Sequence, residues 1–136
     1  MRLEDSDSSL ILEVCERLPV GVQGAGDTRF SVTVRAGGFE GRCEDVWIGA
    51  GELHQFAVDL ERLHRERTGS AELASMSPEE FRLAILVVGN AGRIAAEGYV
   101  GSKHLGIRGW YRNRIELSID LDPTTVLLLR EQLVVS

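Results

Sequence analysis

The hydrophobic positions between Ala50 and Arg67 recur at the spacing of an α-helix. They fall at i, i+3, i+4, i+7, i+10 and i+11 and form one stripe, which consists of Leu53, Phe56, Ala57, Leu60, Leu63 and His64. Charged and amide side chains occupy most of the other positions, and His64 is expected at the wet edge of the stripe. The pattern therefore predicts a long amphipathic helix that lies across one face of a sheet.

Most other patterned segments alternate apolar and polar residues with a period of two, which is typical of half-buried strands. The clearest examples are residues 30–34 and 114–121. Glycine- and proline-rich stretches at 19–26 and 101–109 are expected to be loops, and Gly37-Gly38 a tight hairpin turn. The sequence predicts strands over residues 9–17, 30–34, 39–48, 70–76, 85–89, 93–100 and 114–121.

The alternation changes phase at Asp45. In the strand after Gly38, Phe39, Gly41 and Cys43 are predicted to point inward, whereas the next apolar residues, Val46 and Ile48, stand on even numbers. An extra residue near Glu44-Asp45 would restore the register as a β-bulge. The alternative is that Trp47 points inward and its two neighbours face a second layer.

Two further segments carry helix signals. Ser77-Pro78-Glu79-Glu80 has a capping serine, a proline and an acid in the order that opens a helix. The apolar residues that follow fit a helix and a strand equally well over 79–88, and we predict one helical turn followed by a strand over 85–89. Asp122-Pro123 opens a C-terminal helix that is apolar on most of its circumference up to Val135. Such a helix is expected to be buried on several sides, by the first helix, the sheet or a second copy of the chain.

The overall prediction is an α+β fold in which an antiparallel sheet of about five to six strands carries two helices on one face. The length of 136 residues suits a single domain spanning 1–136, and 43% hydrophobic with 26% charged residues is typical of a globular protein. The N-terminal residues are acidic and have no apolar core, so they are not expected to form a signal peptide, and no apolar run approaches the length that spans a membrane. A cytoplasmic location without membrane attachment is therefore expected. Cys15 and Cys43 are expected to be reduced thiols that behave as small buried hydrophobes.

No motif for catalysis, metal binding or cofactor binding emerges. Gly21, Gly24 and Gly26 form the pattern G-x-x-G-x-G, which is the reverse of the spacing in a dinucleotide-binding loop. They also precede a strand rather than a helix. Acid pairs have structural explanations, and no nucleophile signature occurs. Metal-ligand spacing is absent among the candidates, which are Cys15, Cys43, His54, His64 and His104. We therefore predict a protein that is not an enzyme, with no metal and no cofactor.

The stretch from Lys103 to Arg114 interleaves cations with aromatic rings. We predict that Arg108, Trp110, Tyr111 and Arg112 bind a partner protein, because Trp, Tyr and Arg dominate protein-binding hot spots. The same residue types bind single-stranded RNA, but the net charge of −6 disfavours a nucleic-acid partner. A third interpretation is a hairpin loop whose Trp110 folds back on the core while its arginines pair with acids of the body.

Several segments resemble a bacterial family of small domains that includes the WapI-type immunity proteins. The matching segments are Phe30-Ser31-Val32-Thr33-Val34, Gly38-Phe39-Glu40-Gly41, Asp45-Val46-Trp47-Ile48, Glu52-Leu53 with Phe56, and the run from Ile115 to Pro123 before a leucine-rich helix. The resemblance implies a cytoplasmic protein that neutralises a toxin domain by binding it. It carries no catalytic residues, and the 103–114 stretch has no counterpart in it.

The functional prediction is a non-catalytic protein-binding domain, an immunity protein that occludes a cognate toxin. Two alternatives stay open. One is an RNA-binding accessory protein that uses residues 103–114. The other is a structural homodimer sealed by the C-terminal helix.

Overall fold

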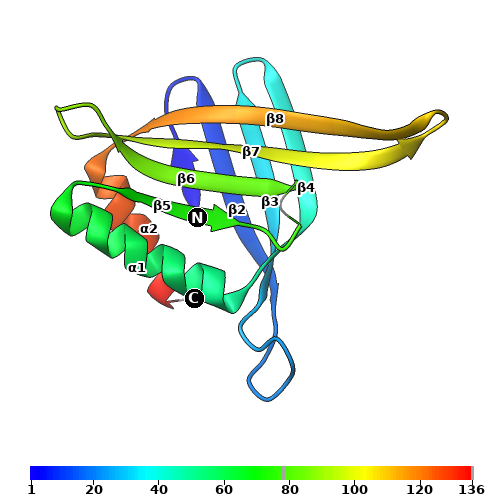
Figure 1. Ribbon diagram of the computed structural model, residues 1–136, viewed down its shortest axis with the longest axis horizontal. Coiled ribbons are helices and arrows are strands. Elements are labelled where there is room, and N and C mark those ends of the chain that lie inside the picture. The colour runs from blue at the N-terminus through cyan, green and yellow to red at the C-terminus, as the bar shows by residue number, and fades with distance from the viewer. Residues whose placement is uncertain (78, 136) are drawn as a thin grey trace.

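The fold of the chain was obtained as a computed structural model, which describes residues 1–77 and 79–135 (Figure 1). Helices and antiparallel strands occur in separate parts of the chain, which confirms the α+β class. The described elements, in chain order, are β1 (Arg2–Glu4), β2 (Ser8–Arg17), β3 (Thr28–Ala36), β4 (Phe39–Ile48), α1 (Ala50–Glu66), β5 (Ser70–Ala74), β6 (Phe81–Val88), β7 (Arg93–Gly106), β8 (Gly109–Leu121) and α2 (Pro123–Val135).

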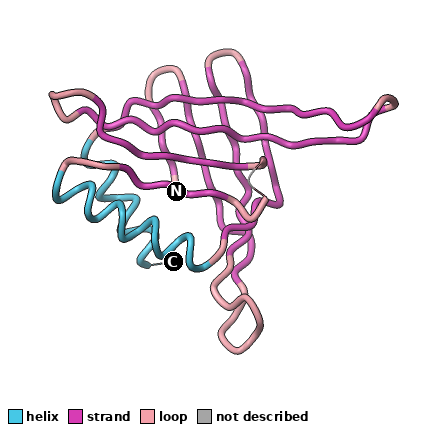
Figure 2. Tube along the Cα trace, viewed as in Figure 1, coloured by secondary structure: helices cyan, strands magenta, loops and turns pink. Residues whose placement is uncertain are grey.

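The strands form two four-stranded sheets, where the sequence pattern suggested one. Their orders are β1-β2-β3-β4 and β5-β6-β7-β8, and every neighbouring pair is antiparallel. Each sheet is therefore a meander in which consecutive strands are hydrogen-bonded neighbours. Figure 2 shows the strands of one sheet running across those of the other. The inward side chains of both sheets meet in one core.

The bulge predicted in β4 is confirmed. Phe30 pairs with Val46 and Val32 pairs with Cys43, so β4 contains one more residue than β3 between these two pairs. Val46 and Ile48 are fully buried as a result, while Trp47 is only partly buried. An extra residue thus restores the inward phase of the strand.

Two residues predicted to be buried are exposed. Phe39 is 74% exposed because β8 crosses β4 near Gly41, where Ile115 leaves no room for a side chain, and Phe39 lies two residues beyond that crossing. Cys15 is exposed because the β2–β3 register shifts between Val14 and Glu16, so Cys15 has no cross-strand partner. Both thiols are free, as predicted.

The two helices pack together beside the second sheet (Figure 1). Helix α1 buries Phe56, Leu60 and Leu63, as its stripe predicted, and ends at Arg67, which adopts a left-handed conformation with φ of 56°. Helix α2 begins as predicted, with an Asp122 carboxylate oxygen accepting the backbone N–H of Thr124 at 2.8 Å.

Helix α2 contributes Val126 and Leu129 to the core, while Leu128 is half exposed. The side chains at 134 and 135 lie outside the described part of the structure. No helix in the described residues is long and apolar enough to cross a membrane.

Two local predictions are wrong. The described residues around the expected helical turn, 77 and 79–80, form a turn in which the Glu80 N–H donates to the Ser77 carbonyl, and Pro78 lies outside the described residues. Strand β6 begins at Phe81 because Phe81 pairs with Val100 of β7. The expected loop over 101–109 is also wrong, since β7 and β8 continue through most of it.

Candidate protein-binding hairpin

Strands β7 and β8 form a hairpin that extends beyond the rest of its sheet. Pairing between β6 and β7 ends at Phe81–Val100, whereas pairing between β7 and β8 continues to Gly106–Gly109. Only Ile107 and Arg108 separate the two strands at the tip. Figure 1 shows this end of β7 and β8 projecting away from both sheets. We call residues 101–114 the hairpin arm.

Glycines permit the arm to form where the sequence suggested a loop. Gly109 has φ of 128°, a backbone conformation that other residues rarely adopt, and it closes the turn. A Cβ atom at Gly106 would lie 2.5 Å from the Tyr111 ring, so the absence of a side chain there makes room for that ring. Glycine is therefore required in this ribbon by packing as well as by turn geometry.

The inner face of the arm continues the buried face of the sheet. The rings of His104 and Tyr111, which are cross-strand partners, stack with centroids 5.8 Å apart and an interplanar angle of 24°. The Asn113 side-chain nitrogen lies 3.3 Å from His104 Nδ1, a distance that allows a hydrogen bond. These contacts connect the two strands, and cross-strand pairs of this kind stabilise a two-stranded ribbon.

The outer face of the arm carries apolar side chains among cations. Leu105 pairs with Trp110 and Lys103 pairs with Arg112, which places these four side chains on the same face. Leu105 is 68% and Trp110 66% exposed, and Lys103 Nζ lies 5.6 Å from the Trp110 ring centroid. Ile107 at the tip is fully exposed. Exposed apolar side chains that lie next to one another are typical of interaction surfaces.

One acidic residue contacts two cations of the arm. Glu79, in the turn before β6, lies 3.4 Å from Lys103 Nζ and 2.5 Å from an Arg112 guanidinium nitrogen. Further along β8, the Arg114 guanidinium lies over the Tyr99 ring at 3.5 Å from its centroid and also contacts Glu116. Arg108 makes no ion pair with any described residue, so the cation at the tip is available to a partner.

The base of the arm is fixed to both sheets. The Gly101 N–H donates to the Glu80 carbonyl at 2.8 Å, and the Cys43 thiol of β4 donates to the Gly101 carbonyl at 3.2 Å. Burial raises the pKa of Cys43, and the nearby Glu80 and Asp45 carboxylates add to the effect. Burial also raises the pKa of Glu80, with a further contribution from Asp45.

A cavity of about 340 Å³ lies at the root of the arm, lined by Met76, Ser77, Glu79, Glu80, Ser102, Lys103, Arg112, Asn113 and Arg114. Among its charged groups, Glu79 contacts both Lys103 and Arg112. Across the described residues, no group of three or more His, Cys, Asp and Glu side chains is placed to hold a metal ion.

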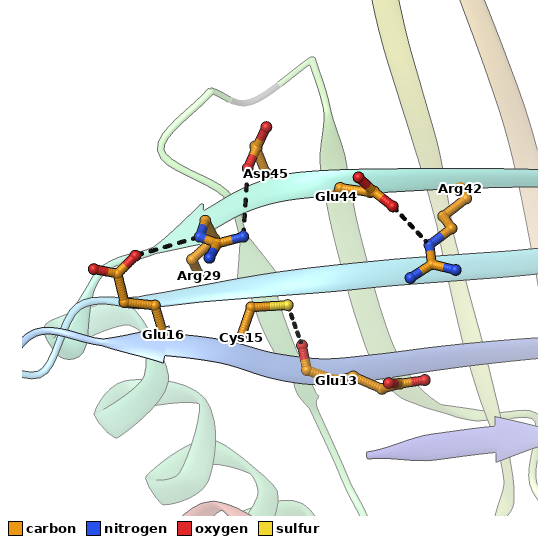
Figure 3. A network of polar contacts seen from close by, with 7 residues as sticks. All are labelled: Glu13, Cys15, Glu16, Arg29, Arg42, Glu44 and Asp45. Atoms are coloured by element: carbon orange, nitrogen blue, oxygen red, sulfur yellow. Dashed lines mark hydrogen bonds and ion pairs between the residues drawn. The ribbon is translucent and has the colours of Figure 1, made fainter.

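The first sheet presents a separate, mostly acidic surface. On the exposed side of β2–β4, Arg29 lies between Glu16 and Asp45, at 3.4 and 3.5 Å, and Arg42 pairs with Glu44 (Figure 3). The Cys15 thiol contacts the Glu13 carbonyl in the same region. These pairs are solvent-exposed and contribute little to stability. In this region the arginines Arg29 and Arg42 therefore lie among acids, whereas the arm carries four cations and no acid.

The structure divides the four predicted site residues between three positions. Trp110 and Arg112 lie on the outer face of the arm, Tyr111 lies on the inner face against His104, and Arg108 occupies the tip. Trp110 does not fold back on the core, although Arg112 does pair with an acid of the body. Sequence reasoning missed the contribution of Glu79, because its position after Pro78 indicated a helix start.

The arrangement is that of a small α+β domain with a basic ribbon that carries four exposed apolar side chains, those of Leu105, Ile107, Trp110 and Tyr111. The model of the immunity protein WapI-like family matches residues 8–134, nearly the whole chain. The chain therefore belongs to the immunity protein WapI-like family. Among curated proteins and solved structures, no significant match is found. Membership implies the family's general role: its proteins neutralise a toxin protein and are generally not enzymes.

Proposed function

We propose that this protein neutralises its toxin by binding it through the hairpin arm and occluding the surface by which the toxin acts. The observation that carries the proposal is the 66% exposure of Trp110 on a ribbon that projects beyond both sheets. Large aromatic side chains are costly to leave in water, and burial of Trp against a partner supplies much of the energy of typical interfaces. We place this encounter in the cytoplasm.

The mechanism is steric. The stacked pair of His104 and Tyr111 holds the two strands together, so little conformational entropy remains to be lost when the ribbon binds. Trp110 and Arg112 then make the contacts on one face, and Arg108 makes them at the tip. Tyr111 acts mainly by positioning the others, because its ring already covers Gly106.

Two features of the arm favour a protein partner over RNA. Trp110 and Tyr111 point to opposite faces, so they cannot stack successive bases on one platform. Glu79 also neutralises part of the charge that phosphates would need, since it contacts both Lys103 and Arg112. A homodimer through α2 has less support, because Val126 and Leu129 of that helix are already buried within the chain.

The test is co-expression with a toxin domain encoded by a gene that neighbours the gene for this chain in its native genome. Wild-type protein should restore growth and bind the purified toxin domain, and Trp110→Ala should weaken binding by about tenfold or more, the usual cost of losing a hot-spot residue. Phe39→Ala is the matched control, because Phe39 is a comparably exposed aromatic residue, at 74%, on the β3–β4 hairpin. Failure of the wild-type chain to bind or protect would refute the proposal.

A further inference from the structure

The arm combines three apolar side chains with cations at its outer face and tip. Leu105, Ile107 and Trp110 are exposed there, and Lys103, Arg108 and Arg112 stand beside them. A surface that fits this arrangement needs an apolar pocket for the first set and carboxylates for the second, because Arg and Lys pair best with carboxylates through charge-assisted hydrogen bonds. A partner surface that is only apolar would leave the cations of the arm unpaired, and one that is only acidic would leave its apolar side chains in water.

The length of the arm separates its charge from that of the acidic body. Residues 101–106 rise about 3.3 Å each, so the arm reaches roughly 17–20 Å past the last pairing with β6. The Debye length at physiological salt is about 8 Å, so the charges of the body are largely screened at the tip. An acidic partner can therefore approach Arg108 even though the chain as a whole has a charge of −6.

Glu79 already occupies the position that a partner carboxylate would take. Its two carboxylate oxygens contact Lys103 and Arg112, and all three side chains are roughly half exposed to solvent. An incoming carboxylate must compete with Glu79 for these cations. Glu79 thus partly neutralises Lys103 and Arg112 until a partner that supplies its own carboxylates binds.

From these observations we infer that the hairpin arm recognises an apolar pocket rimmed by carboxylates on its protein partner, and that Glu79 is an internal competitor for that rim. The inference rests on the proposed function, since it specifies the toxin surface to which the arm binds. It makes two opposite predictions for charge. Removing the charge of Glu79 strengthens binding, whereas reversing the charge of Arg108 weakens it.

A random copolymer of glutamate and tyrosine serves as the probe, because it offers carboxylates and apolar rings without any toxin. In a Trp47→Phe background Trp110 is the single tryptophan and reports binding through its fluorescence. The copolymer should shift the emission of Trp110, with binding that weakens from about 20 mM to about 200 mM salt. Poly-lysine should leave the emission unchanged, and poly-uridylate should bind less tightly than the copolymer.

Two variants test the charge argument. Glu79→Gln should tighten copolymer binding by about two- to fivefold, the range of an exposed ion pair, and Arg108→Glu should weaken it by at least as much. Glu97→Gln and Arg35→Glu are matched controls on exposed strand positions away from the arm and should leave binding unchanged. The inference is overturned if Arg108→Glu has no effect, if Glu79→Gln weakens binding, or if poly-uridylate binds more tightly.

The same variants separate this inference from the proposed function. If the wild-type chain protects against the toxin while Glu79→Gln and Arg108→Glu bind the toxin as it does, the function stands and the carboxylate rim is refuted. If the chain gives no protection at all, the proposed function fails, whatever the copolymer result.

Discussion

The Asp5 carboxylate accepts a hydrogen bond from the backbone N–H of Asp120 at 3.0 Å, although 115 residues separate the two in the sequence. The other carboxylate oxygen of Asp5 accepts the N–H groups of Asp7 and Ser8 at 2.8 and 2.9 Å. One side chain therefore shapes the β1–β2 turn and connects it to the edge of β8. Because β8 belongs to the second sheet, this contact links the two sheets directly.

Replacing Asp5 should cost stability in a pH-dependent way. These hydrogen bonds, that from Asp120 first, hold the pKa of Asp5 below its usual value. A carboxylate with a depressed pKa stabilises the fold above its unfolded pKa, about 3.9, and that contribution is lost as the pH falls through the folded pKa. We expect Asp5→Ala to lose about 1 kcal/mol at pH 7, since the group is largely solvated, and much less at pH 2 to 3.

Urea unfolding at the two pH values measures this effect. Asp7→Ala is the control, because Asp7 lies in the same turn but only its backbone is bonded there. An equal loss for both variants, or a loss for Asp5→Ala that does not change with pH, would show that the carboxylate contacts do not stabilise the fold.

Phe56→Ala should destabilise the protein more than any exposed substitution on the same helix. The Phe56 ring is fully buried between α1 and the sheet core, and removal of such a ring costs about 3–5 kcal/mol. Val58→Ala, at a half-exposed position two residues away, should cost less than about 1 kcal/mol. The denaturant midpoints of the two variants, compared at a constant m-value, measure the difference. Similar midpoints for Phe56→Ala and Val58→Ala would contradict the packing described for α1.

Gly106→Ala should loosen the arm without unfolding the body. The new Cβ atom would lie 2.5 Å from the Tyr111 ring, which must move and lose its stacking on His104. We expect faster amide exchange over residues 102–113 with little change in the midpoint of global unfolding. Gly38→Ala, which meets no atom within 4 Å in the other hairpin, is the control. Unchanged exchange in the arm would mean that the stacked pair does not order it.

The two thiols should react at very different rates. Cys15 is exposed, whereas Cys43 is half buried, donates to the Gly101 carbonyl and has a raised pKa. Since the thiolate is the reactive form, Cys43 should be modified slowly near pH 8 and Cys15 quickly. Ellman's reagent should give one fast and one slow phase, and Cys15→Ser should remove the fast phase. A fast remaining phase would show that the base of the arm opens readily.

Periodicity was sufficient to predict the fold class and the helix that faces the core. The stripe through Phe56, Leu60 and Leu63, the cap at Asp122 and the bulge after Cys43 could all be predicted because each depends on neighbours along the chain. Phe39 was misplaced because its burial depends on where β8 of the second sheet crosses β4, and Cys15 because the β2–β3 register shifts beside it. The single sheet was expected because alternation within strands carries no information about which strands share a sheet.

The arm was harder to predict than the body. Gly101, Gly106 and Gly109 indicated a loop, yet two of them are glycine because neighbouring groups leave no room for a Cβ atom. The binding role of the aromatic and basic residues of 103–114 stays a prediction. Their division between two faces could not be predicted, because it depends on the pairing of Lys103 with Arg112. Glu79 could not be linked to them, since the contact joins positions more than twenty residues apart.

The hydrogen bond from Gly101 to Glu80 is the last backbone hydrogen bond that joins β7 to the neighbouring turn. Among the described residues, the backbone of the ribbon beyond it is hydrogen-bonded only to itself. Its length can therefore change without disturbing either sheet. Side chains alternate between faces, so deleting one residue from each strand would exchange the outer and inner sets, whereas deleting two from each would preserve them. The reach of this ribbon can thus be adjusted in steps of about 7 Å, and each step would change how far the proposed binding face extends from the two sheets.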